Sequence, residues 1–376
     1  MQGKYGVFVR DLDGTLIHRI NDYVSLRILM TLNDSGSWSI KSTTTDPCPF
    51  DPGMGIITVR NDKFLYGGVV NKIQDKMNAK TGLYTWEVSG VGDLGYLSRR
   101  LCYVDPSTGD TTARNHYRDS GDLALVVERL ISRNLGEDAM EARREPIITS
   151  NVLSTIGVNT SVELRFQNLL KAVVTTCRKS GYNIRPMWNK SLSKIYYELF
   201  VGVNRSQEIV FTEQLNNILG SEFIAVAPEG NAIVGGGRGE MTERSFAFVE
   251  NANSIEQWGR IEKFADGRNE DDIDEYASQK LEEHSENLVG YSCTASDNDN
   301  APQFGIDYDL GDIVSMKIGS TFIAAEVQQV EITVSEGKET ISPKFGTVAV
   351  GKFREIFAKL SNIRDDVDEL LGAEIE

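Results

Sequence analysis

The sequence has few of the residues that build metal sites, disulfide frameworks and membrane spans. Only three of its 376 residues are histidine and four are cysteine, and no two cysteines form a C-x-x-C pair: Cys48, Cys102, Cys177 and Cys293. This spacing indicates neither zinc nor disulfides and favours buried free thiols in a reducing compartment. The N-terminus has no signal-peptide core, and no apolar run approaches membrane-spanning length. We therefore expect no cofactor, no metal and no membrane-spanning segment.

Positive charge is also scarce. The chain has 39 Lys and Arg against 55 Asp and Glu, which gives a formal net charge of −16. Because a nucleic-acid duplex repels such a balance, the composition argues against a protein that grips phosphates, although not against one past which DNA slides. At 376 residues the chain is too long for one core and predicts two to four domains.

Antiparallel β-structure is predicted for the first hundred residues. Apolar, alternating segments separated by turn residues predict strands or hairpins at residues 5–10, 15–20, 24–32, 55–70 and 83–92. The hairpin at 55–70 turns at Asn61-Asp62. Strands this closely spaced indicate a barrel-like or sandwich domain rather than βαβ units.

The middle of the chain is predicted to mix helices and strands. An amphipathic helix is expected over residues 119–137 with Asp119 and Ser120 as its cap, and another over residues 161–182. Strands are expected at residues 183–188, 194–203 and 208–212, the last two joined as a hairpin through Asn204–Gln207. Hairpin material over 232–250, a helix from about Asp271 to Asn287 and β-structure over 289–350 follow.

The predicted fold class is therefore α+β and multidomain. Two β-barrel-like domains at the chain ends flank two mixed α/β domains, and an amphipathic C-terminal helix follows. The predicted boundaries are residues 1–104, 105–221, 222–288, 289–350 and 351–376.

The motif Asp-Leu-Asp-Gly-Thr at residues 11–15 is the signature of haloacid-dehalogenase-type phosphatases. In such an enzyme Asp11 attacks phosphorus, Asp13 protonates the leaving group, and Mg²⁺ neutralises the developing charge. The chemistry needs a parallel strand before the motif, a helix after it and a second acidic cluster. Because further strands follow Thr15 and that cluster is missing, the motif is interpreted as a hairpin turn. An Asp-nucleophile phosphatase is the alternative.

Two glycine-rich segments resemble phosphate-binding loops. Gly90–Gly95 matches the dinucleotide fingerprint, but no βαβ unit fits around it, so a strand-to-helix connection is favoured. Gly235–Glu240 lacks the Lys-Ser/Thr of a P-loop and is predicted to be a hairpin tip. The acidic run Glu270–Glu275 lacks calcium-loop spacing and is predicted to start a helix. No catalytic residues are proposed from these patterns.

Apolar residues near the C-terminus recur at alternating spacings of three and four, the a/d pattern of a coiled coil. They are the candidate oligomer interface: Phe353, Ile356, Leu360, Ile363, Val367 and Leu370. Ile at two d positions with Leu and Phe at a fits trimers or larger assemblies. A terminal helix packed on its own domain is the equal alternative, because the pattern covers few heptads.

Five segments occur along the chain in a characteristic order: VFVRDLDGTLIHRINDYVSLRILMTLNDSGSWSI, GIITVRNDKFLYGGVV, IVFTEQLNNI, WGRIEKFADGRN and DYDLGDIVSMKIG. In this order the chain resembles the baseplate-hub (tail-tip) minor tail proteins of long-tailed bacteriophages, in particular those infecting Gram-positive and actinobacterial hosts. The resemblance spans roughly residues 5–350 and excludes the heptad helix.

The resemblance implies a non-enzymatic virion component, made in the host cytoplasm, that forms the hub of the tail tip. It implies a homotrimeric ring in which two barrel-like domains per subunit alternate with pseudo-sixfold symmetry. The implied partners are the distal tail protein ring, the tape-measure protein and receptor-binding or fibre proteins. DNA would pass through the channel without specific binding, and the acidic composition favours a negatively lined lumen. The hub of a non-viral tail-like injection system is a further alternative.

Overall fold

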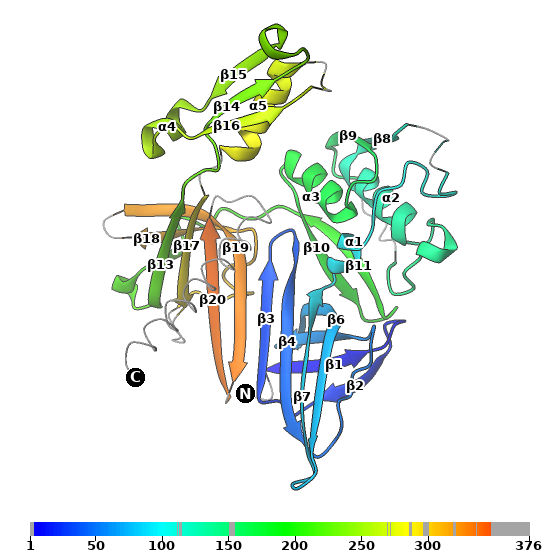
Figure 1. The fold of residues 1–376 in the computed structure, drawn as a ribbon. Helices are drawn as coiled ribbons and strands as arrows, with labels where there is room; N and C mark the ends of the chain where they lie inside the picture. Colours follow the sequence, from blue (N-terminus) through cyan, green and yellow to red (C-terminus); the bar gives the residue numbers. More distant parts are fainter. Residues whose placement is uncertain are drawn as a thin grey trace. The chain divides into compact units, whose positions relative to one another are not determined.

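The computed structural model describes residues 4–110, 112, 115–149, 155–268, 270, 272–285, 288–295, 301–318, 321–335 and 337–346. The chain divides into two compact units. The first unit comprises residues 1–220 and 293–344, and the second comprises residues 221–292 and 345–376. The described residues are mainly β-structure with several sheets and a smaller share of helix, as an α+β class requires (Figure 1).

Seven N-terminal strands form an antiparallel sheet in the first unit: β1 (Tyr5–Arg10), β2 (Leu16–Ile20), β3 (Ser25–Thr31), β4 (Asp34–Thr44), β5 (Gly55–Arg60), β6 (Lys63–Asn78) and β7 (Leu83–Gly92). Their order in the sheet is β3-β4-β7-β6-β5-β1-β2. Asn61 and Asp62, which join β5 to β6, have φ values of 49° and 62°. A two-residue hairpin loop requires this left-handed geometry at both positions, so the predicted turn is confirmed.

Strands from the other end of the chain extend the same sheet. These strands are β18 (Ile313–Ile318), β19 (Thr321–Ser335) and β20 (Lys338–Gly346). Earlier in the chain, the short strand β12 (Val210–Phe211) joins the sheet beside β18 and is followed by the 3₁₀ helix η2 (Glu213–Leu215). The first part of the long β19 pairs with β18, and its second part pairs with β3. Among the described strands this order is an open path and closes no barrel, which corrects the expected barrel-like closure at the chain ends.

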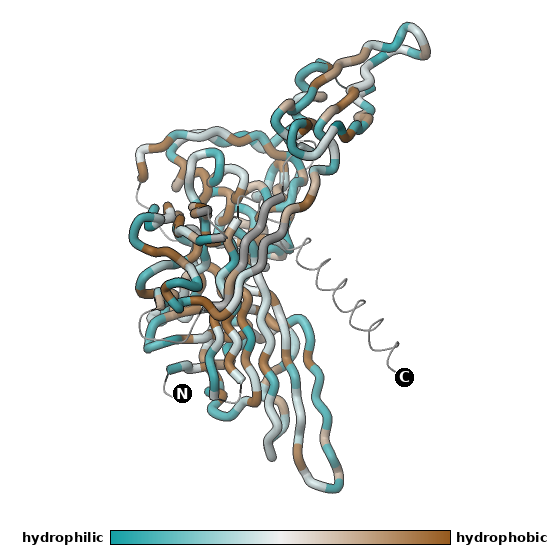
Figure 2. The backbone as a smooth tube through the Cα atoms, turned by 90° about the vertical axis from the view of Figure 1, so that its left-hand side faces the viewer, coloured by the Kyte–Doolittle hydropathy of each residue, from teal (hydrophilic) through white to brown (hydrophobic). Residues whose placement is uncertain are grey.

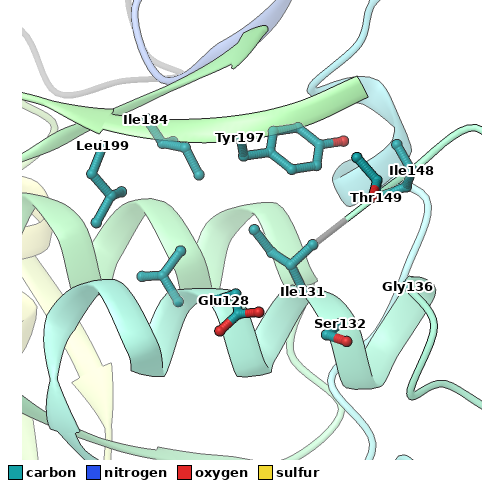
Figure 3. Close-up of a pocket in the computed structure, with 10 residues that line it drawn as sticks. Glu128, Ile131, Ser132, Gly136, Ile148, Thr149, Ile184, Tyr197 and Leu199 are labelled. Atoms are coloured by element: carbon teal, nitrogen blue, oxygen red, sulfur yellow. The ribbon is translucent and has the colours of Figure 1, made fainter. Parts of the chain in front are cut away.

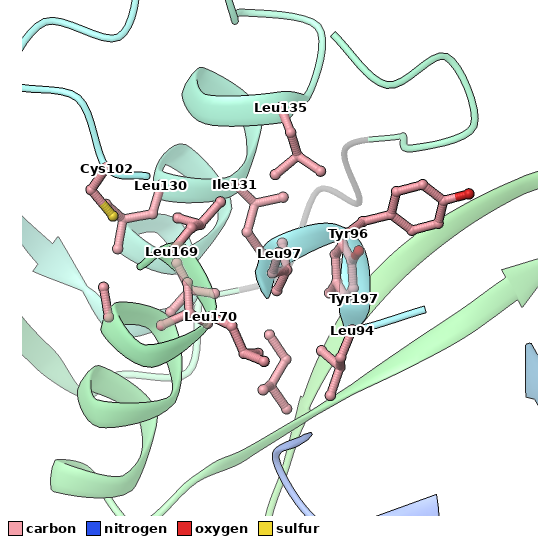
Figure 4. Close-up of a cluster of buried hydrophobic side chains, with 14 of the residues drawn as sticks. Leu94, Tyr96, Leu97, Cys102, Leu130, Ile131, Leu135, Leu169, Leu170 and Tyr197 are labelled. Carbon is pink, nitrogen blue, oxygen red and sulfur yellow. The ribbon is translucent and has the colours of Figure 1, made fainter. Parts of the chain in front are cut away.

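A helical layer packs beside this sheet in the first unit. It contains α1 (Gly95–Ser98), β8 (Tyr117–Asp122), α2 (Leu123–Leu135), η1 (Glu141–Arg143), β9 (Asn159–Leu164), α3 (Leu169–Lys179), β10 (Asn183–Asn189) and β11 (Lys194–Phe200). Buried side chains of the three α-helices pack against the β10–β11 hairpin (Figure 4). Leu97, Leu130, Leu169 and Tyr197 belong to this core, so one apolar cluster holds the helices and the hairpin together.

The second unit contains a two-layer α/β structure. Its elements are β14 (Ala232–Gly236), η3 (Met241–Glu243), β15 (Phe246–Glu250), α4 (Ala252–Trp258), β16 (Glu262–Asp266) and α5 (Ile273–His284). The strands before and after it in the chain, β13 (Ile218–Val226) and β17 (Leu288–Ala295), belong instead to the large sheet that contains β20. β14 lies between β15, which is antiparallel to it, and β16, which is parallel. α5 covers one face of this sheet through Ile233, Ala247 and Ala277 (Figure 1).

Both helices predicted in the middle of the chain exist, but each begins later than expected. The first starts at Leu123 and is capped by Asp122, whose carboxylate accepts a hydrogen bond of 3.0 Å from the amide of Ala124. The second starts after Asn168, which accepts a bond of 3.1 Å from the Lys171 amide. The residues before each helix form β8 and β9, which pair with each other. The residues before each helix were predicted to be helical from their periodicity, but they form strands because they pair with each other.

The predicted hairpin through Asn204–Gln207 is wrong. β11 ends at Phe200 and pairs with β10, whereas β12 runs parallel to β18, about a hundred residues further along the chain. Local turn residues cannot reveal such a long-range parallel pairing. The five predicted domain boundaries remain a prediction that is finer than the two observed units.

Candidate functional site

The Asp-Leu-Asp-Gly motif forms the turn between β1 and β2. The side-chain oxygen Oδ1 of Asp11 accepts hydrogen bonds from the amides of Asp13, at 3.0 Å, and Thr15, at 2.8 Å. Gly14 has a φ of 96°, which favours glycine. Because β1 is antiparallel to both of its neighbours, the parallel-strand context of a phosphatase is not present around this motif. The hairpin interpretation of Asp11 and Asp13 is confirmed.

The Gly90–Gly95 segment connects β7 to α1, as predicted. Its aspartate, Asp93, lies in the core and is not exposed for binding a ligand. Asp93 is buried and forms an ion pair with Arg10, which is equally buried. The hydroxyl of Tyr197 donates a 3.1 Å hydrogen bond to the Asp93 carbonyl oxygen. A side chain at Gly67 would place its Cβ 2.2 Å from Oδ2 of Asp93, so this glycine makes room for the carboxylate.

Burial raises the pKa of Asp93 to about 6, against the opposing effect of the Arg10 charge and hydrogen bond. The Arg10 guanidinium carbon also lies 5.9 Å from the Tyr96 ring centroid and 6.0 Å from that of Trp188. Among the described residues, Nε and Nη1 of Arg10 have no hydrogen-bond partner. The pair was missed from the sequence; the available signal was a lone arginine at the end of the apolar run Tyr5–Val9.

The Gly235–Glu240 segment is a hairpin tip, as predicted. It links the antiparallel strands β14 and β15, and the amide of Gly237 donates to the Ser245 carbonyl at 2.9 Å. That amide is therefore not available to cradle an anion. The predicted acidic helix start is also confirmed, because Asp272 caps α5 by accepting bonds from Asp274 and Glu275 at 3.0 and 2.9 Å.

Three of the four cysteines are buried thiols, which confirms the prediction for them. Burial raises the pKa values of Cys102, Cys177 and Cys293 to about 12, so these thiols stay protonated and inert at neutral pH. Cys48 is only partly buried. The candidate coiled-coil residues Phe353, Ile356, Leu360, Ile363, Val367 and Leu370 lie outside the described residues.

The seam between β3 and β19 joins the N-terminal and C-terminal strands of the first unit. Ser25–Thr31 pairs antiparallel with Gln329–Ser335. On the buried face Ile28 lies opposite Ile332, and both side chains are fully buried. On the other face Nε of Arg27 lies 2.6 Å from Oε1 of Glu331. Apolar packing and an ion pair thus fix the same register.

A buried charge cluster reinforces this junction. Glu339 of β20 accepts hydrogen bonds from Lys4 and Tyr5 and lies 2.9 Å from Nε of Arg60. Arg60 also donates to the carbonyl of Phe304 at 2.7 Å. Burial by itself would raise the pKa of Glu339, but the hydrogen bonds from Arg60, Lys4 and Tyr5 outweigh it and hold that pKa below its usual range. The ionised carboxylate therefore ties β1, β5 and β20 together.

A groove of about 400 Å³ opens beside this cluster. The β3–β4 turn, the β5–β6 hairpin, β10 and the segment before β18 line it. Its lining mixes charged side chains, including Arg60 and Lys63, with apolar ones such as Phe64 and Ile306. An apolar surface with charged groups around it is typical of contacts with polypeptide.

A second cavity lies between α2 and the β10–β11 hairpin (Figure 3). Ile131, Ile184 and Leu199 line it, and its volume of about 20 Å³ holds roughly one water molecule. Among the described residues no group of three or more His, Cys, Asp and Glu is placed to hold a metal ion. No helix among those residues is long and apolar enough to cross a membrane.

Three solved structures share this fold along most of the chain. The 43 kDa tail protein of prophage MuSo2 from Shewanella oneidensis is 9% identical with a TM-score of 0.55, and the match covers 91% of this chain and 97% of that one. Prophage tail protein gp18 from Listeria monocytogenes EGD-e is 10% identical with a TM-score of 0.53, covering 96% and 99%. The tail protein from Neisseria meningitidis MC58 is 10% identical with a TM-score of 0.52, covering 91% and 96%. At these identities the likeness establishes the fold alone.

No curated protein matches this chain. A family model described as Siphovirus ReqiPepy6 Gp37-like protein matches residues 6–347, which includes most of both units. The resemblance to tail proteins of long-tailed phages is thereby confirmed, and the matched family is one of tail proteins rather than of enzymes. This chain belongs to the Siphovirus ReqiPepy6 Gp37-like protein family of siphovirus tail proteins.

Proposed function

We propose that this tail protein is the structural hub of a phage tail tip. Three copies would form a ring that joins the distal tail protein ring and the tape-measure protein to receptor-binding or fibre proteins. The ring would surround the channel through which DNA leaves, and the net charge of −16 favours a lumen that repels DNA. Its role would be mechanical, with no catalytic step.

The observation that carries this proposal is the β3–β19 seam. Through it, β-structure from both ends of one chain shares a sheet, held by the Ile28–Ile332 contact and the Glu339 charge cluster. A subunit with two joined β-regions supplies six such regions in a trimer. That number is what a trimer needs to match a hexameric tail ring, because each region then faces one subunit of the hexamer.

The test is the mass and shape of the purified full-length protein. We expect light scattering to give three times the 41.7 kDa of one chain, and negative-stain class averages to show rings with threefold symmetry. Added distal tail protein should join the ring in one complex. A single-chain mass across a dilution series, with no association with the distal tail ring, would overturn the proposal.

A further inference from the structure

The sheet of the second unit has one face covered by α5 and an opposite face with an aromatic surface. Phe248 of β15, Val234 of β14 and Phe264 of β16 lie opposite one another across the three strands, and Phe246 lies two residues along β15 from Phe248, on the same face. Phe248 is 73% exposed and Phe264 is 53% exposed. We call Phe246, Phe248, Phe264 and Val234 the aromatic face. Exposed apolar side chains that lie next to one another often mark a contact site, whereas single exposed apolar residues are common on any protein surface.

The charges around the aromatic face are already paired with one another. Nη2 of Arg244 lies 2.7 Å from Oδ1 of Asp266, and the Arg244 guanidinium is 5.3 Å from the Phe264 ring centroid. At the other end Arg260 lies 2.6 Å from Glu250 and 2.8 Å from Glu262. A partner can therefore cover this face without burying a lone charge, which is the costly step in forming an interface.

The charge of the surrounding segment indicates which partner fits. Residues 221–292 contain 16 Asp and Glu but only six Lys and Arg, a net charge of −10. Residues 1–104 contain 12 Lys and Arg and ten Asp and Glu, a net charge of +2. Since the whole chain carries −16, the other 272 residues together carry −18. Opposite net charges therefore favour a contact between the N-terminal part of one copy and segment 221–292 of another.

The basic part includes a projecting hairpin. From Lys72 onward β6 pairs only with β7, while β4 accompanies β7 as far as Tyr84, so the loop at the end of the hairpin extends beyond the neighbouring strands (Figures 1 and 2). Lys72, Lys76 and Lys80 are exposed, and none of them forms an ion pair with a described residue. Met77 is 56% exposed and lies opposite Tyr84. Lysines protect an edge strand from unwanted pairing, but that role does not account for an exposed methionine at the tip.

We infer that the β6–β7 tip, residues 71–83, of one copy docks on the aromatic face of a second copy. Met77 of the tip and Tyr84, which directly follows the tip in β7, would contact the phenylalanine rings, since thioether sulfur and aromatic rings pack favourably. The three lysines would be drawn to the acidic segment around that face. The contact joins two different surfaces, so successive copies can close into a ring. The inference rests on the proposed homotrimer and names one of its contacts.

The test compares four full-length proteins by light scattering over a dilution series: the unchanged protein, Phe248→Asp, Met77→Asp and the control Phe322→Asp. Phe322 of β19 is also an exposed phenylalanine but lies outside the aromatic face. Losing a central contact residue should raise the midpoint concentration for dissociation by about thirtyfold in Phe248→Asp and in Met77→Asp. Phe322→Asp should leave the midpoint unchanged, and circular dichroism checks that each variant is folded.

The outcomes separate this inference from the proposed function. If the unchanged protein is trimeric and both test variants match Phe322→Asp, the docking contact is wrong while the ring stands. A loss confined to one of the two variants also overturns the pairing of tip and face. If the unchanged protein is a single chain throughout, the proposed ring itself fails. As a second measurement, mixing Met77→Cys with Phe248→Cys protein should give disulfide-linked pairs that neither variant forms alone.

Discussion

Arg10 and Asp93 lie in the core of the first unit, where water neither screens nor replaces their interaction. Taking both charges out of water is costly, so the pair adds little net stability, yet removing one partner leaves the other charge buried alone. The two residues come from β1 and from the connection after β7, which the pair holds together. Replacing both residues by uncharged ones should therefore destabilise the protein by less than the sum of the two single replacements.

We predict that Asp93→Asn lowers the free energy of unfolding by about 3–5 kcal/mol, because the Arg10 charge loses its carboxylate in the core. The double variant Arg10→Met with Asp93→Asn should lose less than the sum of the two single variants. Urea titration followed by tryptophan fluorescence measures each value. As a matched control, Glu331→Gln breaks the half-exposed pair with Arg27 and should cost less than about 1 kcal/mol. Equal losses for Asp93→Asn and Glu331→Gln would contradict the prediction.

The raised pKa of Asp93 also predicts a pH dependence. The folded state holds the Asp93 proton up to about pH 6, whereas the unfolded state releases it near the ordinary value of 3.8. The folded state thus binds more protons in this window, so Asp93's contribution to stability is full below it and is lost as the pH rises through about 6. Glu339 acts in the opposite sense, because its lowered pKa gives stability that is lost on acidification.

Subtracting the stability of Asp93→Asn from that of the unchanged protein at each pH isolates this contribution. We expect the difference to fall between about pH 4 and pH 6, by at most about 3 kcal/mol. A difference that stays flat or rises over that range would show that the Asp93 carboxyl is already ionised in the folded protein below pH 4.

At the scale of elements, the seam between β3 and β19 makes the two ends of the chain fold as one structure. Ile332 is fully buried against Ile28, across more than three hundred residues of sequence. A contact this distant along the chain must repay a large loss of chain entropy, which the two strands repay together through their shared burial. Damage to β19 should therefore reach β3.

We predict that Ile332→Ala lowers the free energy of unfolding by about 2–5 kcal/mol, through lost burial and the cavity that remains. Hydrogen exchange should speed up in β3 as well as β19, while β14 of the second unit keeps its protection. Ile17→Ala, at a half-exposed position of β2, is the control and should leave all three strands unchanged. Faster exchange in β19 with an unaltered β3 would mean that the two strands open independently.

The elements that the sequence predicted well are those with local signals. The β5–β6 hairpin carries Asn61-Asp62 at its turn, and α5 has Asp272 as a visible cap, so both were predicted from neighbouring residues alone. The Asp11–Asp13 turn was predicted because further strands follow it. By contrast, the β12–β18 and β3–β19 pairings and the Arg10–Asp93 pair join residues more than eighty positions apart. No local pattern marks such partners, because each is set by the packing of the whole unit.

At the scale of the whole molecule, the uneven distribution of charge would govern how copies meet in the proposed ring. The second unit's segment 221–292 carries −10, while the tip at residues 71–83 carries three lysines and one aspartate, a net +2. Interactions between exposed charges reach about 10 Å at 0.1 M salt and about 3 Å at 1 M. The attraction between these parts of two copies is therefore sensitive to salt, whereas the apolar contact at the aromatic face is not weakened by it.

We predict that raising the salt from about 0.1 M to about 1 M increases the midpoint concentration for trimer dissociation by roughly tenfold. In the triple variant Lys72→Glu, Lys76→Glu and Lys80→Glu the trend should reverse, since salt then screens a repulsion between the tip and the acidic segment. The control Lys171→Glu alters an exposed lysine of α3 and should keep the salt response of the unchanged protein. Light scattering at each salt concentration measures the midpoint. If instead the trimer of all three proteins becomes tighter as salt is added, association depends on apolar contact alone. The role of the three lysines would then be to protect an edge strand from unwanted pairing.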